Sequence, residues 1–377
     1  MKRVLIVFIL LGLLLFQTQV SAASGEREIL YKALEKCSPK ENQLFHYQRK
    51  KQSLGHFSEP WQTMSRDYSG AFSLGLGGAE LSICDTLDRR GKQYYSQTYY
   101  TPGLLYRVYF GRDTYAEIDS EEVKEFLFEA ALYSPFFLLK DCNQVLESSE
   151  EDVHLIAGAM NTFSYSKEHG TKVELDLDPR NNQLVEARII YADPLYGDVT
   201  KRILYSGYQT MEGSETSYPT RVQEEELDIV KNALSVEWLP AGSSLDWVKM
   251  EIPSDYRIGA HVTPKSSIRF EHYDKHVHLL HLPHADEQVL LVEFNDFLLV
   301  GEAPFSADNG QMILDEVKKL FPNKPVRYFV FGHHHPHYIG GIRAFVANGA
   351  HIISYTEDST YVQQLVLFLH EIHPDTL

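Results

Sequence analysis

Four histidines occupy the five positions 333–337 of the chain. They directly follow residues 326–331, a short apolar run typical of a buried strand, and the ends of buried strands are where α/β sheets usually hold ligands. Positions two apart share a face of an extended chain, so His333, His335 and His337 are expected to converge on one point. Three neutral imidazoles predict a Zn²⁺ site with an open fourth position, where a bound water would have a pKa of about 7.

The neighbours of these histidines support the same interpretation. Pro336 stiffens the segment, and Gly340-Gly341 would let the backbone pass close to a bound ion. His334 is expected to turn away from the other three imidazoles. The alternatives are a histidine-rich surface that takes up metal without catalysis and a single histidine hydrogen-bonded in a core; the position between a buried strand and a Gly-Gly turn favours a metal site.

The second half of the chain must position this segment, and residues 261–377 hold 13 of the 17 histidines. Strands are predicted at 289–293, 297–300, 326–331 and 352–355, and helices at 313–321, at 342–348 and from Ser359 onward. Strands separated by helices of this length indicate a layered α/β domain. Other histidines, such as His276 and His278, are interpreted as part of a polar sheet face.

The first half differs in composition and predicts mostly β structure. Residues 173–178 alternate apolar and charged side chains, and turn residues separate further strands at 184–191, 203–205 and 218–222. Successive hairpins of this kind suit an antiparallel meander. Helical character is confined to 27–35 and 121–132, and no paired catalytic group stands out.

Residues 288–358 resemble the first half of the metallo-β-lactamase superfamily, whose motif reads H-x-H-x-D-H-x-G-G. His333 and His335 match the two histidines of its first zinc site, and the paired glycines match as well. His337 stands where the family has its Asp, and Tyr338 where it has its third histidine. Glu302 takes the place of the acidic residue that supports the metal loop.

The resemblance implies a partial αββα domain and a zinc-dependent hydrolase, in which metal-activated water attacks an ester, an amide or a similar small-molecule substrate. His333 and His335 would be metal ligands, and His337 a third ligand or the base that takes the proton of the water. Glu302 would accept a hydrogen bond from a ligand imidazole. Since His337 and Tyr338 replace two family ligands, one zinc ion is expected rather than two.

The same resemblance makes the chain shorter than expected, because the second half of the superfamily domain has no counterpart. A truncated product, a non-catalytic descendant and completion by another chain are the three explanations, of which truncation is favoured. The tyrosine-rich first half resembles the lipoprotein-carrier-like β domain that sometimes precedes that hydrolase domain. The alternative function is therefore an exported, non-catalytic binding protein for an apolar or lipid-like ligand, and metal scavenging is a third.

Residues 1–23 predict a cleaved signal peptide, because a short cationic start precedes an apolar run too short to span a bilayer. The chain is then expected in the periplasm or outside the cell, without a stable membrane span. A net charge of −17 disfavours nucleic-acid partners. Cys37, Cys84 and Cys142 predict either one disulfide or three thiols.

The fold class expected overall is α+β or α/β in two domains. An antiparallel, β-rich N-terminal domain at 24–255 precedes a partial metallo-β-lactamase-like domain at 260–377. The oligomeric state and the substrate are left open by the sequence.

Overall fold

The protein is described by a computed structural model that covers residues 25–54, 63–101, 104–110, 114–117, 126–149, 152–167, 170–193, 195–240, 243, 254–258, 265–367 and 371. The predicted signal peptide at 1–23 lies outside these residues, as do most of residues 241–264, where the predicted domain boundary falls. The domain limits therefore stay a prediction.

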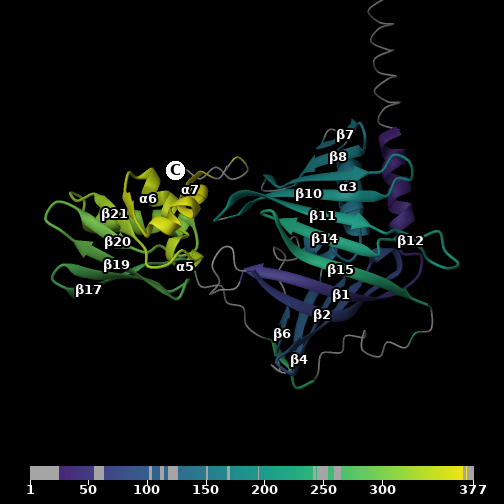
Figure 1. Ribbon diagram of the computed structural model, residues 1–377, viewed down its shortest axis with the longest axis horizontal. Coiled ribbons are helices and arrows are strands. Elements are labelled where there is room, and N and C mark those ends of the chain that lie inside the picture. The colour runs from purple at the N-terminus through teal and green to yellow at the C-terminus, as the bar shows by residue number, and fades with distance from the viewer. Residues whose placement is uncertain are drawn as a thin grey trace, which may run out of the picture.

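The larger of the two main sheets has fourteen strands in the described residues, in the order β16-β6-β5-β4-β3-β2-β1-β15-β14-β11-β10-β9-β8-β7 (Figure 1). Its strands are β1 (Gln43–Leu54), β2 (Thr63–Leu74), β3 (Leu81–Arg89), β4 (Lys92–Thr101), β5 (Leu104–Phe110), β6 (Thr114–Glu117), β7 (Val153–Ala157), β8 (Asn161–Ser166), β9 (Lys172–Leu177), β10 (Leu184–Asp193), β11 (Gly197–Ser206), β14 (Arg221–Glu226), β15 (Ile229–Leu239) and β16 (Arg257–Ile258). Neighbouring strands are antiparallel, apart from the parallel pair of β16 and β6. A large antiparallel β-rich region, as predicted, is confirmed.

The sheet joins two runs of strands that are distant in sequence. Strands β1–β6 form one run, and β7–β11 with β14 and β15 form the other. They meet where β1 pairs with β15, in a register that extends from Leu44 opposite Leu239 to Lys51 opposite Asn232. We call this pairing the seam. A separate ribbon, β12 (Gln209–Thr210) with β13 (Ser217–Tyr218), lies in the connection between β11 and β14.

Helices cover one face of the large sheet, which we call the inner face (Figure 1). They comprise residues 25–37, residues 126–130 and α3 (Phe136–Ser148), and together we call them the cover. Because alternate residues of a strand point to opposite faces, each strand sends one apolar set inward. The core so formed includes the fully buried side chains of Phe45, Phe72, Phe163, Leu138 and Leu139.

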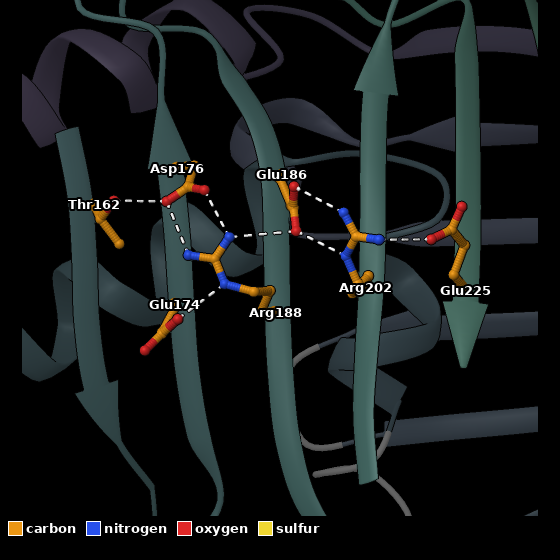
Figure 2. A network of polar contacts seen from close by, with 7 residues as sticks. All are labelled: Thr162, Glu174, Asp176, Glu186, Arg188, Arg202 and Glu225. Atoms are coloured by element: carbon orange, nitrogen blue, oxygen red, sulfur yellow. Dashed lines mark hydrogen bonds and ion pairs between the residues drawn. The ribbon is translucent and has the colours of Figure 1, made fainter. Parts of the chain in front are cut away.

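A ladder of ion pairs runs across the opposite, outer face of the sheet, from β8 to β14 (Figure 2). Arg188 binds Asp176 at 2.6 Å and Glu174 at 2.9 Å, and Arg202 binds Glu186 at 2.9 Å. Thr162 and Glu225 terminate the ladder at its two ends. Each guanidinium lies between carboxylates of neighbouring strands, so the ladder opposes slippage of their register.

The second main sheet has six strands in the described residues, in the order β17-β18-β19-β20-β21-β22. Its elements are β17 (Arg269–Asp274), β18 (Val277–Leu282), β19 (Glu287–Glu293), β20 (Leu298–Gly301), α4 (Ala307–Leu320), β21 (Val326–Val330), α5 (Pro336–Ile339), α6 (Ile342–Ala347), β22 (His351–Ile353) and α7 (Ser359–Leu367). Strands β20, β21 and β22 are parallel to one another, and the other neighbours are antiparallel.

A partial αββα domain was expected at residues 260–377, and the described residues 265–367 give no evidence of one. An αββα sandwich stacks two sheets, whereas the strands described in this range form one sheet. Helices were predicted at 313–321 and 342–348. The first begins earlier than predicted, at Ala307, where Ser306 accepts a hydrogen bond from the Asn309 N–H, and the second is followed by Gly349 with a left-handed φ of 81°.

One hairpin of the large sheet contacts the second core. The side chain of Leu195, in the turn between β10 and β11, is buried in the apolar cluster of the second sheet, and Tyr196 packs on the same cluster. Tyr196 is also hydrogen-bonded to Tyr361 of α7. The large sheet therefore contacts the second core through this turn.

Two further expectations concern the membrane and the cysteines. No helix among the described residues is long and apolar enough to cross a bilayer. Cys37, Cys84 and Cys142 are free thiols, so the alternative of three thiols is the one observed. Burial raises the pKa of Cys37 and of Cys84 to about 12, which leaves both thiols protonated and unreactive at neutral pH.

We expect Arg188→Gln to lower the free energy of unfolding at pH 7 by about 2 kcal/mol, because it leaves partly buried carboxylates without their cation. Burial raises the pKa of Asp176, but hydrogen bonds from Arg188 and Thr162 outweigh it and the net pKa is lowered. A lowered pKa stabilises the fold above the unfolded value, and this contribution is lost as the pH falls through the folded value. The variant should therefore unfold at a higher pH during acid titration.

Urea unfolding at several pH values, followed by circular dichroism, measures both effects. Arg221→Gln is the matched control, because Arg221 is exposed on β14 of the same sheet and is not one of the ladder residues. Equal stability losses in the two variants would show that the ladder does not stabilise the sheet.

Candidate functional site

The structure brings three consecutive histidines together directly after β21. His333, His334 and His335 each offer a ring nitrogen, and these three atoms lie within 4.8 Å of one another. The ring centroids of His333 and His335 are 4.0 Å apart, and those of His333 and His334 are 4.6 Å apart. His334 and His335 are each only 6% exposed. We call these three residues the histidine cluster.

The cluster differs from the predicted set in two members. His334 was expected to turn away but lies in the cluster, where its Nδ1 is 3.4 Å from Asp358 Oδ1. His337 lies on α5, and its ring centroid is 5.0 Å from that of Phe305. The prediction assumed an extended chain through position 337. Helix α5 begins at Pro336, so the alternation of faces ends one residue after His335.

Glu302 lies beside the cluster at the end of β20, with a left-handed φ of 73°. Its carboxylate accepts a hydrogen bond from the backbone N–H of Gly332, and burial raises its pKa. Its contact is thus with the backbone of the loop that carries the histidines. The predicted hydrogen bond to a ligand imidazole stays a prediction.

The paired glycines serve packing in the structure. A Cβ atom at Gly340 would lie 2.2 Å from the carbonyl carbon of Phe305, and one at Gly341 would lie 2.7 Å from Cβ of Ala303. Backbone hydrogen bonds from Ala303 to Tyr338 and from Gly341 to Ala303 hold the two segments together. The glycines therefore let the histidine loop lie against residues 303–305, which explains them without a bound ion.

His278 is buried, contrary to the interpretation of a polar sheet face. It is 1% exposed and packs against the rings of Phe270 and Phe321. Its Nδ1 is 3.1 Å from Nδ1 of His272, and its Nε2 is 3.6 Å from Glu293. Burial lowers the pKa of His278. A neutral imidazole that bridges His272 and Glu293 fits these contacts as a core histidine.

A second polar group, at the seam on the inner face, was not predicted. Arg49 of β1 is 10% exposed in its side chain and donates to Asp85 at 2.7 Å and to Tyr133 at 3.0 Å. Its guanidinium carbon lies 4.5 Å from the ring centroid of Tyr68. Its Nε has no hydrogen-bond partner among the described residues.

Lys51 follows Arg49 on the same face of β1. The register places Lys51 opposite Arg66 of β2 on one side and opposite Asn232 of β15 on the other. Both basic side chains are partly buried, and no carboxylate is recorded at ion-pair distance from either in the part of the chain that the structure describes. Burial lowers the pKa of Lys51, and the nearby charge of Arg49 lowers it further. We call Lys51 and Arg66 the cation pair.

The outer face of the same strands carries a shallow hollow of about 590 Å³. Lys50 and Gln48 of β1, Arg221 of β14 and Ser235 of β15 are among its lining residues. These four side chains are exposed and belong to the opposite set of the strand alternation from Arg49 and Lys51, although Arg49 also contributes to the lining.

Comparison with known proteins finds only weak similarity to this chain. No protein-family model matches the chain. No curated protein matches it either. Among solved structures, the chain is similar to the crystal structure of the LolA superfamily protein NE2245 from Nitrosomonas europaea, at 12% sequence identity and a TM-score of 0.36. The similarity covers 56% of this chain and 90% of that one.

These findings contradict the resemblance to the metallo-β-lactamase superfamily. Neither the family models nor the curated proteins support it, and the strands described at residues 265–367 form a single sheet. The prediction of a zinc-dependent hydrolase of that superfamily is therefore wrong. A short motif of histidines and glycines arises readily where a tight loop follows a strand, and Gly340 and Gly341 have a packing reason of their own.

We expect Gly340→Ala to destabilise the protein by about 3 kcal/mol, because the added methyl group would overlap the backbone of Phe305. Gly332→Ala is the control, since its Cβ would lie 3.7 Å from Glu302 Oε1, an ordinary contact. Thermal unfolding and hydrogen exchange of residues 333–341 measure the effect. Equal protection factors in both variants would contradict the packing role of Gly340.

Proposed function

We propose that the protein is an exported, non-catalytic binding protein for an apolar or lipid-like ligand, held between the inner face of the large sheet and its cover. The observation that carries the proposal is the continuous apolar surface that the seam creates on this face. The proposed place of action is the periplasm. The prediction that the chain is an enzyme stays a prediction.

The chemistry of the inner face supports this proposal. Aromatic rings from the sheet and from the cover are in contact there: Phe45 and Phe72 stack at 4.6 Å, and Tyr133 meets Phe72 edge-on at 5.2 Å. Rings of this kind offer a large apolar area with few conformations to lose on binding. The surface would be exposed to a ligand if the cover moved away from the sheet.

The cover is built of short pieces, which several polar contacts attach to the sheet, among them one from Arg107 to Glu129 at 3.1 Å. The OH of Tyr205 donates to the carbonyl of Ala131 at 2.8 Å, and Asp141 of α3 accepts from Tyr165 at 2.8 Å and from Lys167 at 2.9 Å. Short helices gain most of their stability from the face they bury. A ligand that offered the same apolar contact could replace them with little loss.

We expect a neutral apolar fluorophore such as 1-aminoanthracene to bind the protein, and Tyr100→Ala to weaken that binding about fivefold. Tyr100 packs on the edge of this core, 5.0 Å from the ring of Phe126, so its loss removes apolar contact area. Tyr95→Ala on the same strand is the matched control, because Tyr95 is exposed.

Fluorescence titration measures the affinities, and native mass spectrometry of the protein purified without detergent would detect a co-purifying lipid. Absence of fluorophore binding would contradict the proposed function. Equal loss in the two tyrosine variants would move the ligand away from the inner face.

A second proposal concerns the histidine cluster, as a site for one divalent transition-metal ion such as Zn²⁺. Metal–nitrogen bonds of about 2.0–2.1 Å require the donor atoms to converge, which small ring rotations of His333, His334 and His335 would achieve. Asp358 beside His334 Nδ1 would orient that ring in the way that outer carboxylates orient ligand imidazoles. We propose no hydrolytic reaction at this site.

We expect His335→Ala to abolish metal binding, whereas His337→Ala should leave it unchanged. The two positions differ because His335 is in the cluster and His337 is not. Metal content after dialysis against Zn²⁺ or Co²⁺, and the rise in melting temperature on metal addition, measure the binding. Retention of stoichiometric metal by His335→Ala would contradict the site, and loss in His337→Ala would restore the originally predicted ligand set.

A further inference from the structure

The cation pair is an unusual feature of the seam. Like charges directly opposite each other on neighbouring strands destabilise a sheet, and partial burial increases that cost. Lys51 and Arg66 occupy such opposite positions. The ladder of ion pairs on the outer face shows how charges on neighbouring strands are usually neutralised: every guanidinium lies between carboxylates (Figure 2).

The three carboxylates that interact electrostatically with Lys51, those of Asp85, Glu129 and Glu224, already have other partners. Asp85 binds Arg49 at 2.7 Å, and Glu129 binds Arg107 at 3.1 Å. Glu224 binds Lys201 at 3.1 Å and accepts from Asn232. In each of these pairs the carboxylate neutralises the charge of its own basic partner. Among the described residues, no carboxylate is therefore left to neutralise Lys51.

Two buried polar atoms near Lys51 also lack a hydrogen-bond partner among the described residues. Nε of Arg49 donates to no described acceptor, and the side chain of Arg49 is nine-tenths buried. Asn232, which is 6% exposed, has an Oδ1 that likewise receives no hydrogen bond in the described part of the chain. Both residues flank Lys51, through β1 and β15. Such groups are rarely left unsatisfied in native structures.

We propose that Lys51 and Arg66 bind the anionic headgroup of an amphiphile whose apolar chain lies along the inner face. This inference rests on the proposed ligand-binding function and names its ligand class, a long-chain carboxylate or a phosphate ester. A guanidinium and an ammonium together offer the forked and the point-like donors that such oxygens accept.

The direction of β1 fits such a ligand. Along one face of this strand the chain passes from Lys51 through Arg49 and Tyr47 to Phe45, that is, from the cations to the fully buried aromatic core. Six residues of strand span about 20 Å, the scale of a long acyl chain. Burial is the main cause of the lowered pKa of Lys51, and it outweighs the carboxylates of Glu129, Glu224 and Asp85, which raise it; an anionic headgroup would raise it further.

The test compares cis-parinaric acid with its methyl ester, two fluorescent probes that differ only in the charge of the headgroup. We expect the wild-type chain to bind the acid about tenfold more tightly than the ester. Lys51→Gln should remove this preference by weakening the acid about tenfold and leaving the ester unchanged. Arg66→Gln should do the same, which provides a second variant if the first fails to fold.

Lys50→Gln is the matched control, because Lys50 is the next residue of β1 and lines the outer hollow. It should leave both affinities unchanged. A loss of acid binding in Lys50→Gln alone would place the headgroup on the outer face and overturn the inference. Equal losses of acid and ester in Lys51→Gln would reveal a structural role for Lys51 and would overturn it too.

Two further arms separate the remaining outcomes. Binding of acid and ester with equal affinity by the wild type would overturn the headgroup site while the proposed function stands, whereas binding of neither probe would overturn both. Millimolar acetate and inorganic phosphate should fail to displace the acid. Displacement by either salt at concentrations near the affinity of the acid itself would identify a free-anion site instead.

Discussion

The pairing of β1 with β15 is the interaction on which the large sheet depends. It joins strands that are nearly two hundred residues apart. Without it, the two runs of strands would be separate sheets, each with an additional exposed edge. Long-range antiparallel pairing is favourable only when a shared apolar face is buried at the same time. The cover supplies that burial, since its helices pack on strands from both sides of the seam.

The same pairing decides where charge can lie. On the outer face, water and neighbouring carboxylates satisfy the arginines, and the ladder of Figure 2 is the result. On the inner face, the apolar core ends at Arg49 and gives way to Lys51 and Asn232. The sheet therefore has two charged regions of opposite character. One is internally neutralised, and the other carries surplus positive charge beside aromatic rings.

The elements of the fold were largely predictable from sequence, because period-two alternation and cap residues are local signals. Residues 173–178 and Gly349 are examples of each. The joining of β1 to β15 was not predictable, since no local pattern encodes which distant strand completes a sheet. Arg49 and Lys51 were overlooked for the same reason. Their alternation with Phe45 and Tyr47 marked them as inward-facing, but only the register brings Arg66 and Asn232 beside them.

The histidine segment shows a different limit. Its location at the end of a buried strand was predicted correctly, and so was the meeting of His333 with His335. The structure places His334 in the cluster instead of His337, because Pro336 starts a helix where an extended chain was assumed. The role of these histidines as metal ligands stays a prediction. The family resemblance was wrong because a motif of nine positions records types of residue and not their neighbours. Glycines that relieve contact with Phe305 look the same in sequence as glycines that border an ion.

The turn between β10 and β11 has a consequence for how the two sheets communicate. Tyr196 of this turn is hydrogen-bonded to Tyr361, whose ring centroid lies 5.9 Å from that of His334. Strand β10 also contributes the fully buried Ala187 and Ile189 to the inner face. A displacement of this hairpin would move residues at the inner face and beside the histidine cluster. Thermodynamic linkage would then be reciprocal, so that occupancy beneath the cover and occupancy at the imidazoles would alter each other by the same factor.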